Sequence, residues 1–244
     1  MQTLGDDIVL LALRQDGKFH TAAGQRLRLA VSGAELVELA AARHITIERG
    51  RVVVIDPSPT GDARLDAALA DIQRSRRAPK ASDWVAKQRS KHLGGYLAAL
   101  AAEGVLRPER RKLLGVLPSV RWPAADPGRV DAARARLDAI ALSDEPADAV
   151  HAALGGLVHA IGLDKALYPG REGHSARRRL KLVAERDPAS GAVHDAVRAS
   201  VDASVDAAVE ASVHAAIHAS VHATHHAAAH DAAVGGHGGG GGHH

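Results

Sequence analysis

Residues 57–73, Pro-Ser-Pro-Thr-Gly-Asp-Ala-Arg-Leu-Asp-Ala-Ala-Leu-Ala-Asp-Ile-Gln, decide the fold class because they combine a chain break with a well-marked helix. The prolines and the glycine interrupt regular structure, and Asp62 is of a residue type that caps helix N-termini. Leu65, Leu69 and Ile72 follow at spacings of four and three, which place them on one helical face. The stretch therefore predicts a helix that begins at Asp62 and turns its apolar face toward a core.

The rest of the chain before residue 190 shows the same kind of pattern. Ser32 and Glu35 form a capping-box pattern at the start of one further helix. Runs of β-branched residues predict a β-hairpin over 44–55, and apolar residues around a turn at 117–119 predict a second over 113–123. Further helices are predicted over 7–13, 32–43, 83–103, 129–142, 147–161 and 171–186. The predicted fold class is mainly α, a compact helical-bundle domain with two small β-hairpins.

Composition changes abruptly near residue 190. Residues 191–244 are rich in Ala, His, Val and Gly, and a valine or isoleucine recurs every fourth residue from Val193 to Val221. A period of four advances by about 40° per repeat on a helix of 3.6 residues per turn, so the apolar stripe winds around the axis. We therefore divide the chain into a domain over 1–190 and a low-complexity tail over 191–244 that lies outside the fold.

The tail also carries a histidine array that suggests metal chemistry. Neighbouring imidazoles four residues apart on a helix can share Zn²⁺, but the array contains no carboxylate to orient the rings. We expect adventitious metal binding there and no resident metal or other cofactor. The histidines are His214, His218, His222, His226 and His230.

Charge is distributed unevenly. The formal net charge is +3, yet the tail from Gly191 contributes one cation and five acids, which leaves +7 for the rest. Residues 64–112 alone hold twelve Lys/Arg and five Asp/Glu, which also makes +7. This excess favours an anionic partner, such as phosphorylated lipid, nucleic acid or an acidic peptide. The alternative is an ordinary solvated helix face.

Several functional classes are excluded or disfavoured. The chain has no cysteine, and no phosphate loop, HExxH or GxSxG pattern occurs, so we predict no enzyme. His151 and His159 lie among apolar residues and are predicted to be core histidines. Met1–Asp7 lacks the basic and apolar parts of a signal peptide, and no apolar run is long enough to span a bilayer, so we expect a cytoplasmic protein.

A nucleic-acid-binding protein is the alternative function. A helix over 33–43 followed by a hairpin over 44–55 is similar to the end of a winged helix, with Arg43 and Arg51 as its cations. However, the helix that would enter the groove also carries Glu35 and Glu38, which repel phosphates. Nucleic acid is therefore the less favoured partner.

The residues that decide the fold also carry a family resemblance. Pro59-Thr60-Gly61-Asp62-x-x-Leu65-Asp66-x-Ala68-Leu69 resembles the signature of the Golgi phosphoprotein 3 family. Further similar stretches follow in the family's order and cover about residues 3–190, with a length typical of a bacterial member. They are Gly33–Ala40, Asp83-Trp84-Val85, Leu100–Leu106, the apolar hairpin over Leu113–Pro123, and Leu154–Ala160.

The resemblance implies a helical bundle without enzymatic activity. It also implies a peripheral membrane protein that binds phosphatidylinositol 4-phosphate and acts as an adaptor. The family's headgroup pocket uses a tryptophan and three arginines, which fall here near Ala23-Gly24, at Ser32, and near Ser90 and Leu93, so the pocket motif is not reproduced.

We therefore assign the expected contacts by charge and hydropathy. The lipid-binding basic face is predicted to consist of Arg26, Arg28, Arg74, Arg76, Arg77, Lys87, Arg89 and Lys91. A membrane-contacting or self-associating hairpin is predicted to use Leu114, Val116, Leu117, Val120 and Trp122. Together they predict a cytoplasmic protein that associates peripherally with anionic membrane lipids and discriminates poorly among headgroups.

Overall fold

The structure is a computed structural model of the chain. It describes residues 2–20, 26–87, 91–113, 117–143 and 149–186, together with 193, 195, 197–199 and 202. The chain divides into two units, Met1–Val201 and Asp202–His244, and the second lies outside the described residues except for Asp202. The histidine array predicted to bind metal adventitiously falls in that second unit.

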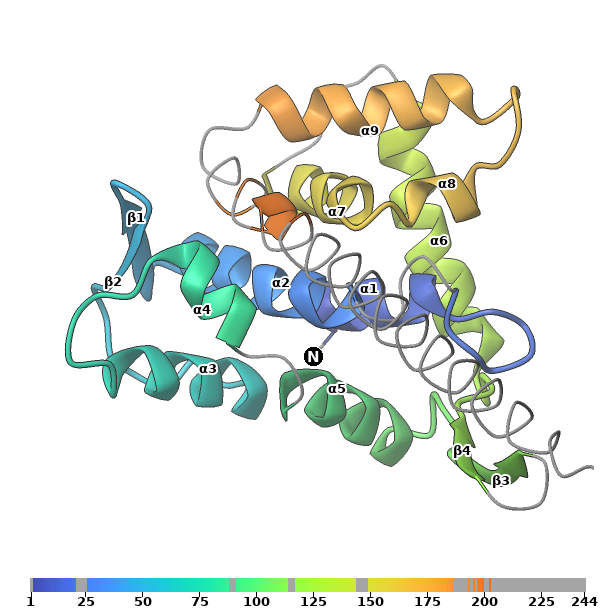
Figure 1. Cartoon of the computed structure of the whole chain (residues 1–244), viewed down its shortest axis with the longest axis horizontal. Helices are drawn as coiled ribbons and strands as arrows, with labels where there is room; N and C mark the ends of the chain where they lie inside the picture. Colours follow the sequence, from blue (N-terminus) through green and yellow to red (C-terminus); the bar gives the residue numbers. More distant parts are fainter. Residues whose placement is uncertain are drawn as a thin grey trace, which may run out of the picture. The chain divides into compact units, whose positions relative to one another are not determined.

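The described part is mainly helical with two small hairpins, which confirms the predicted fold class (Figure 1). The helices are α1 (Leu4–Ala12), α2 (Leu27–Ala41), α3 (Ala63–Gln73), α4 (Ala81–Lys87), α5 (Lys91–Ala102), α6 (Pro127–Ala141), α7 (Ala149–Ala160), α8 (Asp164–Leu167) and α9 (His174–Arg186). The strands are β1 (Ile45–Glu48), β2 (Arg51–Val54), β3 (Glu109–Leu113) and β4 (Leu117–Arg121).

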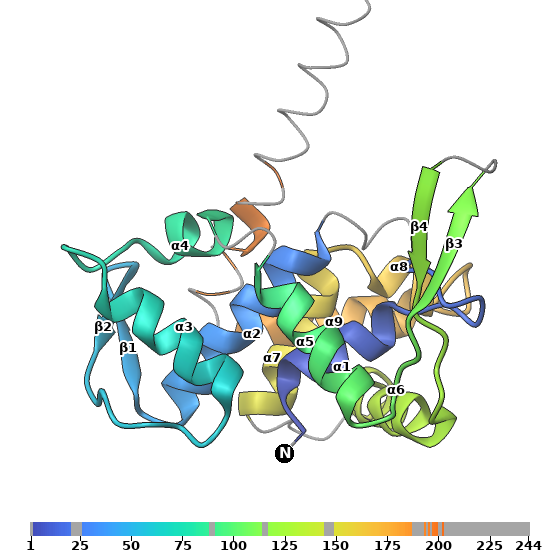
Figure 2. The same ribbon diagram turned by 90° about the horizontal axis from the view of Figure 1, so that it is seen from below.

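Helices α1 and α2 lie at the centre and are covered by the other helices (Figures 1 and 2). Every residue of α1 is buried, and its N-terminus is closed by a capping box between Thr3 and Asp6. Along α2, buried residues occur on all sides of the helix. Helices that are buried on all sides lie inside a protein, so these two helices form the core on which the rest is packed.

The stretch that decided the fold class has a structural role in this core. Asp62 caps α3 as predicted, because its carboxylate accepts a hydrogen bond from the backbone N–H of Arg64 at 2.8 Å. The Asp66 carboxylate accepts hydrogen bonds from the backbone N–H and the hydroxyl of Thr60, both at 2.7 Å. The signature thus fixes the loop before α3 onto the first turns of that helix.

One predicted helix start is wrong. The capping box at Ser32 and Glu35 does not exist, because α2 begins at Leu27 and both residues lie inside it. The Ser32 side chain is fully buried, and its hydroxyl has no hydrogen-bond partner among the described residues. The apolar residues from Leu27 to Val31 extend the buried face of the helix upstream, and this tertiary burial overrides the local capping pattern.

The second hairpin is shifted relative to its prediction. The residues predicted as the turn, 117–119, lie within β4, and the strands pair from Glu109↔Arg121 to Leu113↔Leu117. Residues 114–116, between the two strands, lie outside the described residues. The basic residues Arg110, Arg111 and Lys112 lie in strand β3. Opposite charges face each other across the strands at Glu109 and Arg121, and such pairs stabilise a hairpin exposed to water.

The beginning of the valine repeat belongs to the packed unit. Val193 and Val197 are both fully buried. A Cβ atom placed on Gly33 would lie only 2.7 Å from the Val197 Cγ2 atom and 2.9 Å from the Leu157 Cδ2 atom. Glycine is therefore needed at residue 33 so that α2, α7 and the repeat can approach one another closely. The domain boundary at residue 190 stays a prediction, whereas these two valines pack into the core beyond it.

Candidate functional site

The segment between α3 and α4 is held in place by the first hairpin. Strands β1 and β2 pair antiparallel from Ile45↔Val54 to Glu48↔Arg51. The backbone N–H of Val52 donates to the Pro79 carbonyl, and that of Ala81 donates to the Gly50 carbonyl, both at 2.9 Å. The Arg51 guanidinium adds a hydrogen bond to the Ala78 carbonyl at 2.8 Å. Residues 78–81 thus continue the hairpin as a short third segment, so the connector has a defined path.

This arrangement gathers exposed cations, which we call the basic surface. Its members are Arg49 and Arg51 on the hairpin, Arg74, Arg76, Arg77 and Lys80 on the connector, and Lys87 at the end of α4. Arg74 forms an ion pair with Asp71, and its side chain is still 71% exposed. Within the described part of the chain, Arg76, Arg77, Lys80 and Lys87 form no ion pair. Their charge is therefore available to a partner.

The structure separates two predicted residues from this group. Arg26 and Arg28 are half-buried at the first turn of α2, whereas the hairpin follows the last turn. A helix of 15 residues is about 22 Å long, so α2 keeps these arginines well away from the connector. Arg89 lies outside the described residues, and only the backbone of Lys91 is described. Arg49, Arg51 and Lys80 were absent from the predicted face, although Lys80 lies in the same basic segment.

The second hairpin projects from the same face as α4. Figure 2 shows α4 and the strands β3 and β4 on one side of the helical layer formed by α1, α2 and α5. Val120 is 48% exposed, whereas Trp122 is half-buried at the base of the hairpin and packs against the core. Leu114 and Val116 lie outside the described residues, and the side chain of Leu117 is not described.

A groove of about 440 Å³ lies between α3 and α5, with charged groups along its floor. The Nδ1 atom of His92 is 2.5 Å from the Glu35 carboxylate, and both side chains are buried. The Nε2 atom of His92 is 3.7 Å from the Asp71 carboxylate, and the rings of His92 and Trp84 are nearly perpendicular, with centroids 5.8 Å apart. Burial raises the pKa of Glu35, although the hydrogen bond to His92 acts in the opposite direction.

Arg64, which also lines this groove, forms its contacts within the fold. It contacts Asp6 at 2.5 Å and Asp62 at 2.7 Å, and its guanidinium lies 4.5 Å from the centre of the Tyr96 ring. Burial opposes its charged form, but the hydrogen bonds to Asp62 and Asp6 raise the pKa of Arg64. We call Asp6, Asp62, Arg64, Glu35 and His92 the buried charge network. Its charges pair with one another, so the groove presents few polar groups to a ligand.

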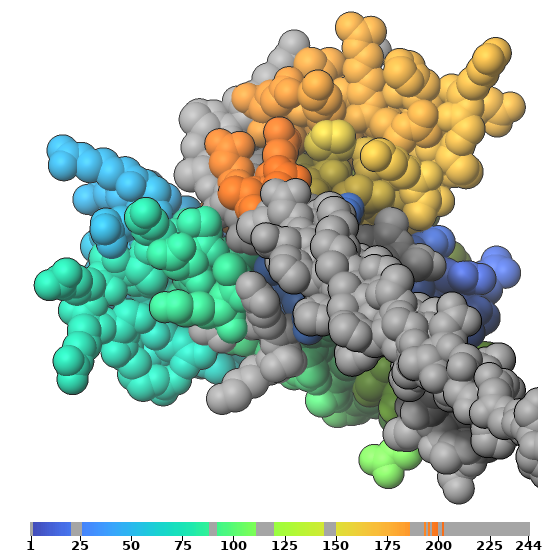
Figure 3. Space-filling model, viewed as in Figure 1, coloured from blue at the N-terminus to red at the C-terminus, as the bar shows by residue number. Residues whose placement is uncertain are grey.

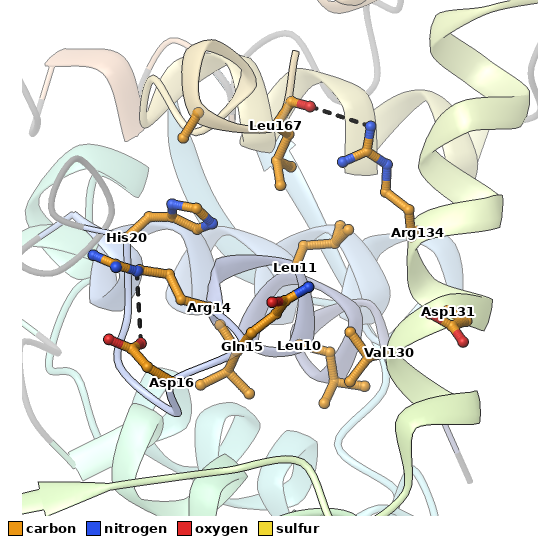
Figure 4. Close-up of a pocket in the computed structure, with 12 residues that line it drawn as sticks. Leu10, Leu11, Arg14, Gln15, Asp16, His20, Val130, Asp131, Arg134 and Leu167 are labelled. Carbon is orange, nitrogen blue, oxygen red and sulfur yellow. Dashed lines mark hydrogen bonds and ion pairs between the residues drawn. The ribbon is translucent and has the colours of Figure 1, made fainter. Parts of the chain in front are cut away.

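A second cavity, of about 570 Å³, lies among α1, α6 and α8 (Figure 4). Its two arginines already have partners, since Arg14 lies 3.6 Å from Asp16 and Arg134 bonds both oxygens of Asp138 at 3.0 and 3.1 Å. His20 faces Arg14, and burial together with that charge lowers the pKa of His20. This cavity is not part of the basic surface.

Among the described residues, no group of three or more His, Asp or Glu side chains is arranged to hold a metal ion. His151 and His159 are half-buried, and the Asp164 carboxylate accepts a hydrogen bond from the Nδ1 atom of His159 at 2.8 Å, which ties α7 to α8. No helix in the described ranges is both long and apolar enough to cross a bilayer.

The chain is similar in sequence to one known protein family. The sequence model of the family described as Golgi phosphoprotein 3 (GPP34) matches residues 4–200. That match includes both hairpins, the connector and the buried valines Val193 and Val197. No curated protein sequence matches the chain.

Proposed function

The chain belongs to the Golgi phosphoprotein 3 family, and on this premise we propose that it binds anionic lipid headgroups at a membrane surface as a non-enzymatic adaptor. The family is known for peripheral Golgi proteins that bind phosphatidylinositol 4-phosphate and is generally non-enzymatic. The observation that carries the proposal is the basic surface, where a backbone-anchored connector presents cations that have no acidic partner in the described part of the chain.

Electrostatics supply useful affinity at such a surface. Each Lys or Arg near an anionic membrane contributes about 1 kcal/mol, and the effect decays within a Debye length. Arg76, Arg77, Lys80 and Lys87 together therefore give salt-sensitive attachment. Arg74 adds less, because Asp71 neutralises part of its charge.

The second hairpin supports the same orientation. Because α4 and the strands β3 and β4 project from one face of the helical layer (Figure 2), a flat membrane can meet both elements together. Inserting an apolar tip alongside an electrostatic contact makes attachment firmer than either alone. Trp122 contributes little to this insertion, because it packs at the hairpin base.

The headgroup pocket of the family is not reproduced at the matching residues. Ser32, which stands where the family has its first pocket arginine, is fully buried and carries no charge. Without arginines fixed in a pocket, the attraction depends on charge density. We therefore propose binding to anionic lipids in general, with phosphatidylinositol 4-phosphate as one of several acceptable headgroups.

Vesicle co-sedimentation tests the proposal. The vesicles contain phosphatidylcholine alone, or phosphatidylcholine mixed with phosphatidylglycerol or with phosphatidylinositol 4-phosphate, at low and at high salt. We expect binding to both anionic compositions at low salt and loss of most of it at high salt. No binding to any anionic vesicle at low salt would remove the proposal. Strong, salt-resistant preference for the phosphoinositide would show that a specific pocket exists.

The alternative function, a winged-helix protein that binds nucleic acid, requires an accessible recognition helix. Helix α2 is enclosed by other helices, so it is not available to lie in a DNA groove. Duplex DNA of the same charge concentration is still a useful competitor in the vesicle experiment. Binding to DNA that exceeds binding to anionic vesicles at equal salt would favour the nucleic-acid function instead.

A further inference from the structure

The cavity among α1, α6 and α8 combines an apolar floor with a polar rim. The loop after α1 and helix α8 lie side by side at the surface there, as blue and gold atoms (Figure 3). The cavity volume of about 570 Å³ falls within the range typical of small-molecule sites. The floor is lined by apolar side chains, of which the two on α1 are buried: Leu10, Leu11, Leu13, Val130, Ala166 and Leu167. The rim consists of Arg14, Gln15, Asp16 and His20 on the loop, and of Asp131 and Arg134 on α6.

The loop that forms one side of the rim has a fixed backbone. The N–H of Arg14 donates to the Lys18 carbonyl at 2.8 Å, and the N–H of Trp122 donates to the Gly17 carbonyl at 2.7 Å. Gly17 has a φ of 72°, and a Cβ atom there would lie only 2.6 Å from the backbone nitrogen of Pro123. Glycine thus lets the loop lie directly against the base of the second hairpin. A wall that is already ordered saves a ligand the free energy of ordering it.

Arg134, on the α6 side of the rim, is held firmly and keeps one donor group unused. Its Nε atom donates to both carboxylate oxygens of Asp138, and its Nη2 atom donates to the Leu167 carbonyl at 3.2 Å. The guanidinium also lies 4.6 Å from the centre of the Tyr168 ring. Its Nη1 atom forms no hydrogen bond to the described residues and is not among their buried polar atoms. A positioned donor therefore remains open to a ligand.

Arg14, on the loop side, provides further donors. Its Nε atom is 3.6 Å from the Asp16 carboxylate, and the two side chains are 49% and 37% exposed. An exposed ion pair of this kind contributes only about 0–1 kcal/mol, so it gives way readily to a better partner. The Asp16 carboxylate also accepts a hydrogen bond from the Lys18 N–H at 3.1 Å. Figure 4 shows Arg14 and His20 on one side of Leu11 and Arg134 on the other.

The rim therefore has guanidinium donors to spare above an apolar floor. A ligand that matches it needs acceptor oxygens at one end and an apolar body at the other. A carboxylate suits best, because its two oxygens fit the paired N–H groups of a guanidinium. Asp131 opposes an anion, but its side chain is exposed, so water and salt screen its charge.

We propose that this cavity binds a small alkyl carboxylate, with the alkyl chain against Leu10 and Leu11 and the carboxylate between Arg14 and Arg134. The site lies apart from the basic surface. It does not depend on membrane binding, so either proposal can fail without the other.

Titration calorimetry of the full chain tests the proposal with three probes that share one alkyl chain and differ in the head group. The probes are octanoate, octanol and octylamine at neutral pH. We expect octanoate to bind with a dissociation constant of about 1 mM or below, and octanol at least about tenfold more weakly. We expect octylamine to bind most weakly, because it brings a cation to the two arginines.

Two variants that remove one charge each from the same loop separate contact from overall charge. Arg14→Gln should weaken octanoate binding about tenfold and leave octanol binding unchanged. Lys18→Gln is the matched control, because Lys18 is exposed on that loop and does not line the cavity, and it should change octanoate binding less than about twofold.

Two further variants test the floor and the opposing charge. Ala166→Leu fills part of the cavity, so it should weaken octanoate and octanol alike while circular dichroism shows an intact fold. Asp131→Asn removes the opposing carboxylate and should strengthen octanoate binding by about two- to threefold.

Each other result overturns the proposal. Absence of octanoate binding at millimolar concentration would mean that the cavity is not a carboxylate site. Equal binding of octanol and octanoate would mean that the arginines do not select the head group, and tighter binding of octylamine would mean that the carboxylates do. Equal weakening by Arg14→Gln and Lys18→Gln would mean that overall charge, and no specific contact, attracts the probe. Octanoate binding that a folded Ala166→Leu variant retains would place the probe elsewhere on the protein.

Discussion

The buried charge network and the basic surface use the same residue types for opposite purposes. In the network, Arg64 has two carboxylates within 2.7 Å and is mostly shielded from water. Its charged contacts link α1, α3 and α5 and are therefore part of the fold. On the basic surface, Arg76 and Arg77 are exposed and form no ion pair within the described residues. A cation that the fold does not need, held on an anchored backbone, is one that a ligand can use.

The largest effect expected from this comparison is on stability. Arg64→Met leaves the Asp6 carboxylate, which is fully buried, without its cation, and breaking a buried pair in this way costs about 3–5 kcal/mol. The control is Arg76→Met, which should change the free energy of unfolding by less than about 0.5 kcal/mol. Urea unfolding measures both, and equal losses for the two variants would contradict the distinction between network and surface.

A second effect comes from a carboxyl group beside the network. Burial raises the pKa of Glu38 to about 7, while its hydrogen bond from the Leu4 N–H, at 2.7 Å, favours the charged form. Its other oxygen is buried without a hydrogen-bond partner among the described residues. The carboxyl group of Glu38 thus binds its proton more tightly in the folded state than in the unfolded state.

The contribution of protonated Glu38 to the free energy of unfolding should therefore be fully present below about pH 4.5. It should be lost as the pH rises through 7, by at most about 3 kcal/mol. Glu38→Gln keeps an acceptor for Leu4 and removes the titration. We expect the unfolding free energy of this variant to vary less between pH 5 and 8 than that of the parent chain. An identical pH dependence in both proteins would show that Glu38 does not titrate in this range.

The smallest effect expected concerns the second hairpin. Val120→Ser removes an exposed apolar side chain, so stability should stay unchanged while binding to anionic vesicles weakens by about fivefold, which corresponds to about 1 kcal/mol. Leu142→Ser, at a residue that is 68% exposed at the end of α6, is the matched control and should have no effect. Equal vesicle binding by the Val120 variant and the parent would remove the hairpin from the contact.

The sequence predicted best where structure is local. Asp62 and the residues after it cap and pattern one helix, and the hairpin over 44–55 follows from its β-branched runs, so both were predicted correctly. The error at Ser32 and Glu35 arose because Glu35 finds His92, 57 residues away, and no local pattern contains that contact.

The candidate site shows the same limit. The count of charges along the sequence correctly singled out the basic connector between α3 and α4, because its cations are neighbours in sequence. It also grouped Arg26 with Arg74, although the length of α2 separates them, and it left out Arg49, which reaches the connector only through hairpin pairing. Which cations share a surface is set by tertiary contacts, and composition does not contain that information.

The proposed function requires that the location of charge, and not its total, sets the affinity for anionic membranes. Vesicle binding of Arg76→Gln with Arg77→Gln should therefore be compared with that of Arg171→Gln with Arg178→Gln. Both variants lose two exposed arginines, but the second pair lies at and just before α9, away from the basic surface. With about 1 kcal/mol for each arginine, we predict that the first variant binds phosphatidylglycerol vesicles about 30-fold more weakly at low salt and the second less than about threefold more weakly. Equal weakening of the two variants would contradict the account, because it would mean that net charge alone provides the attraction.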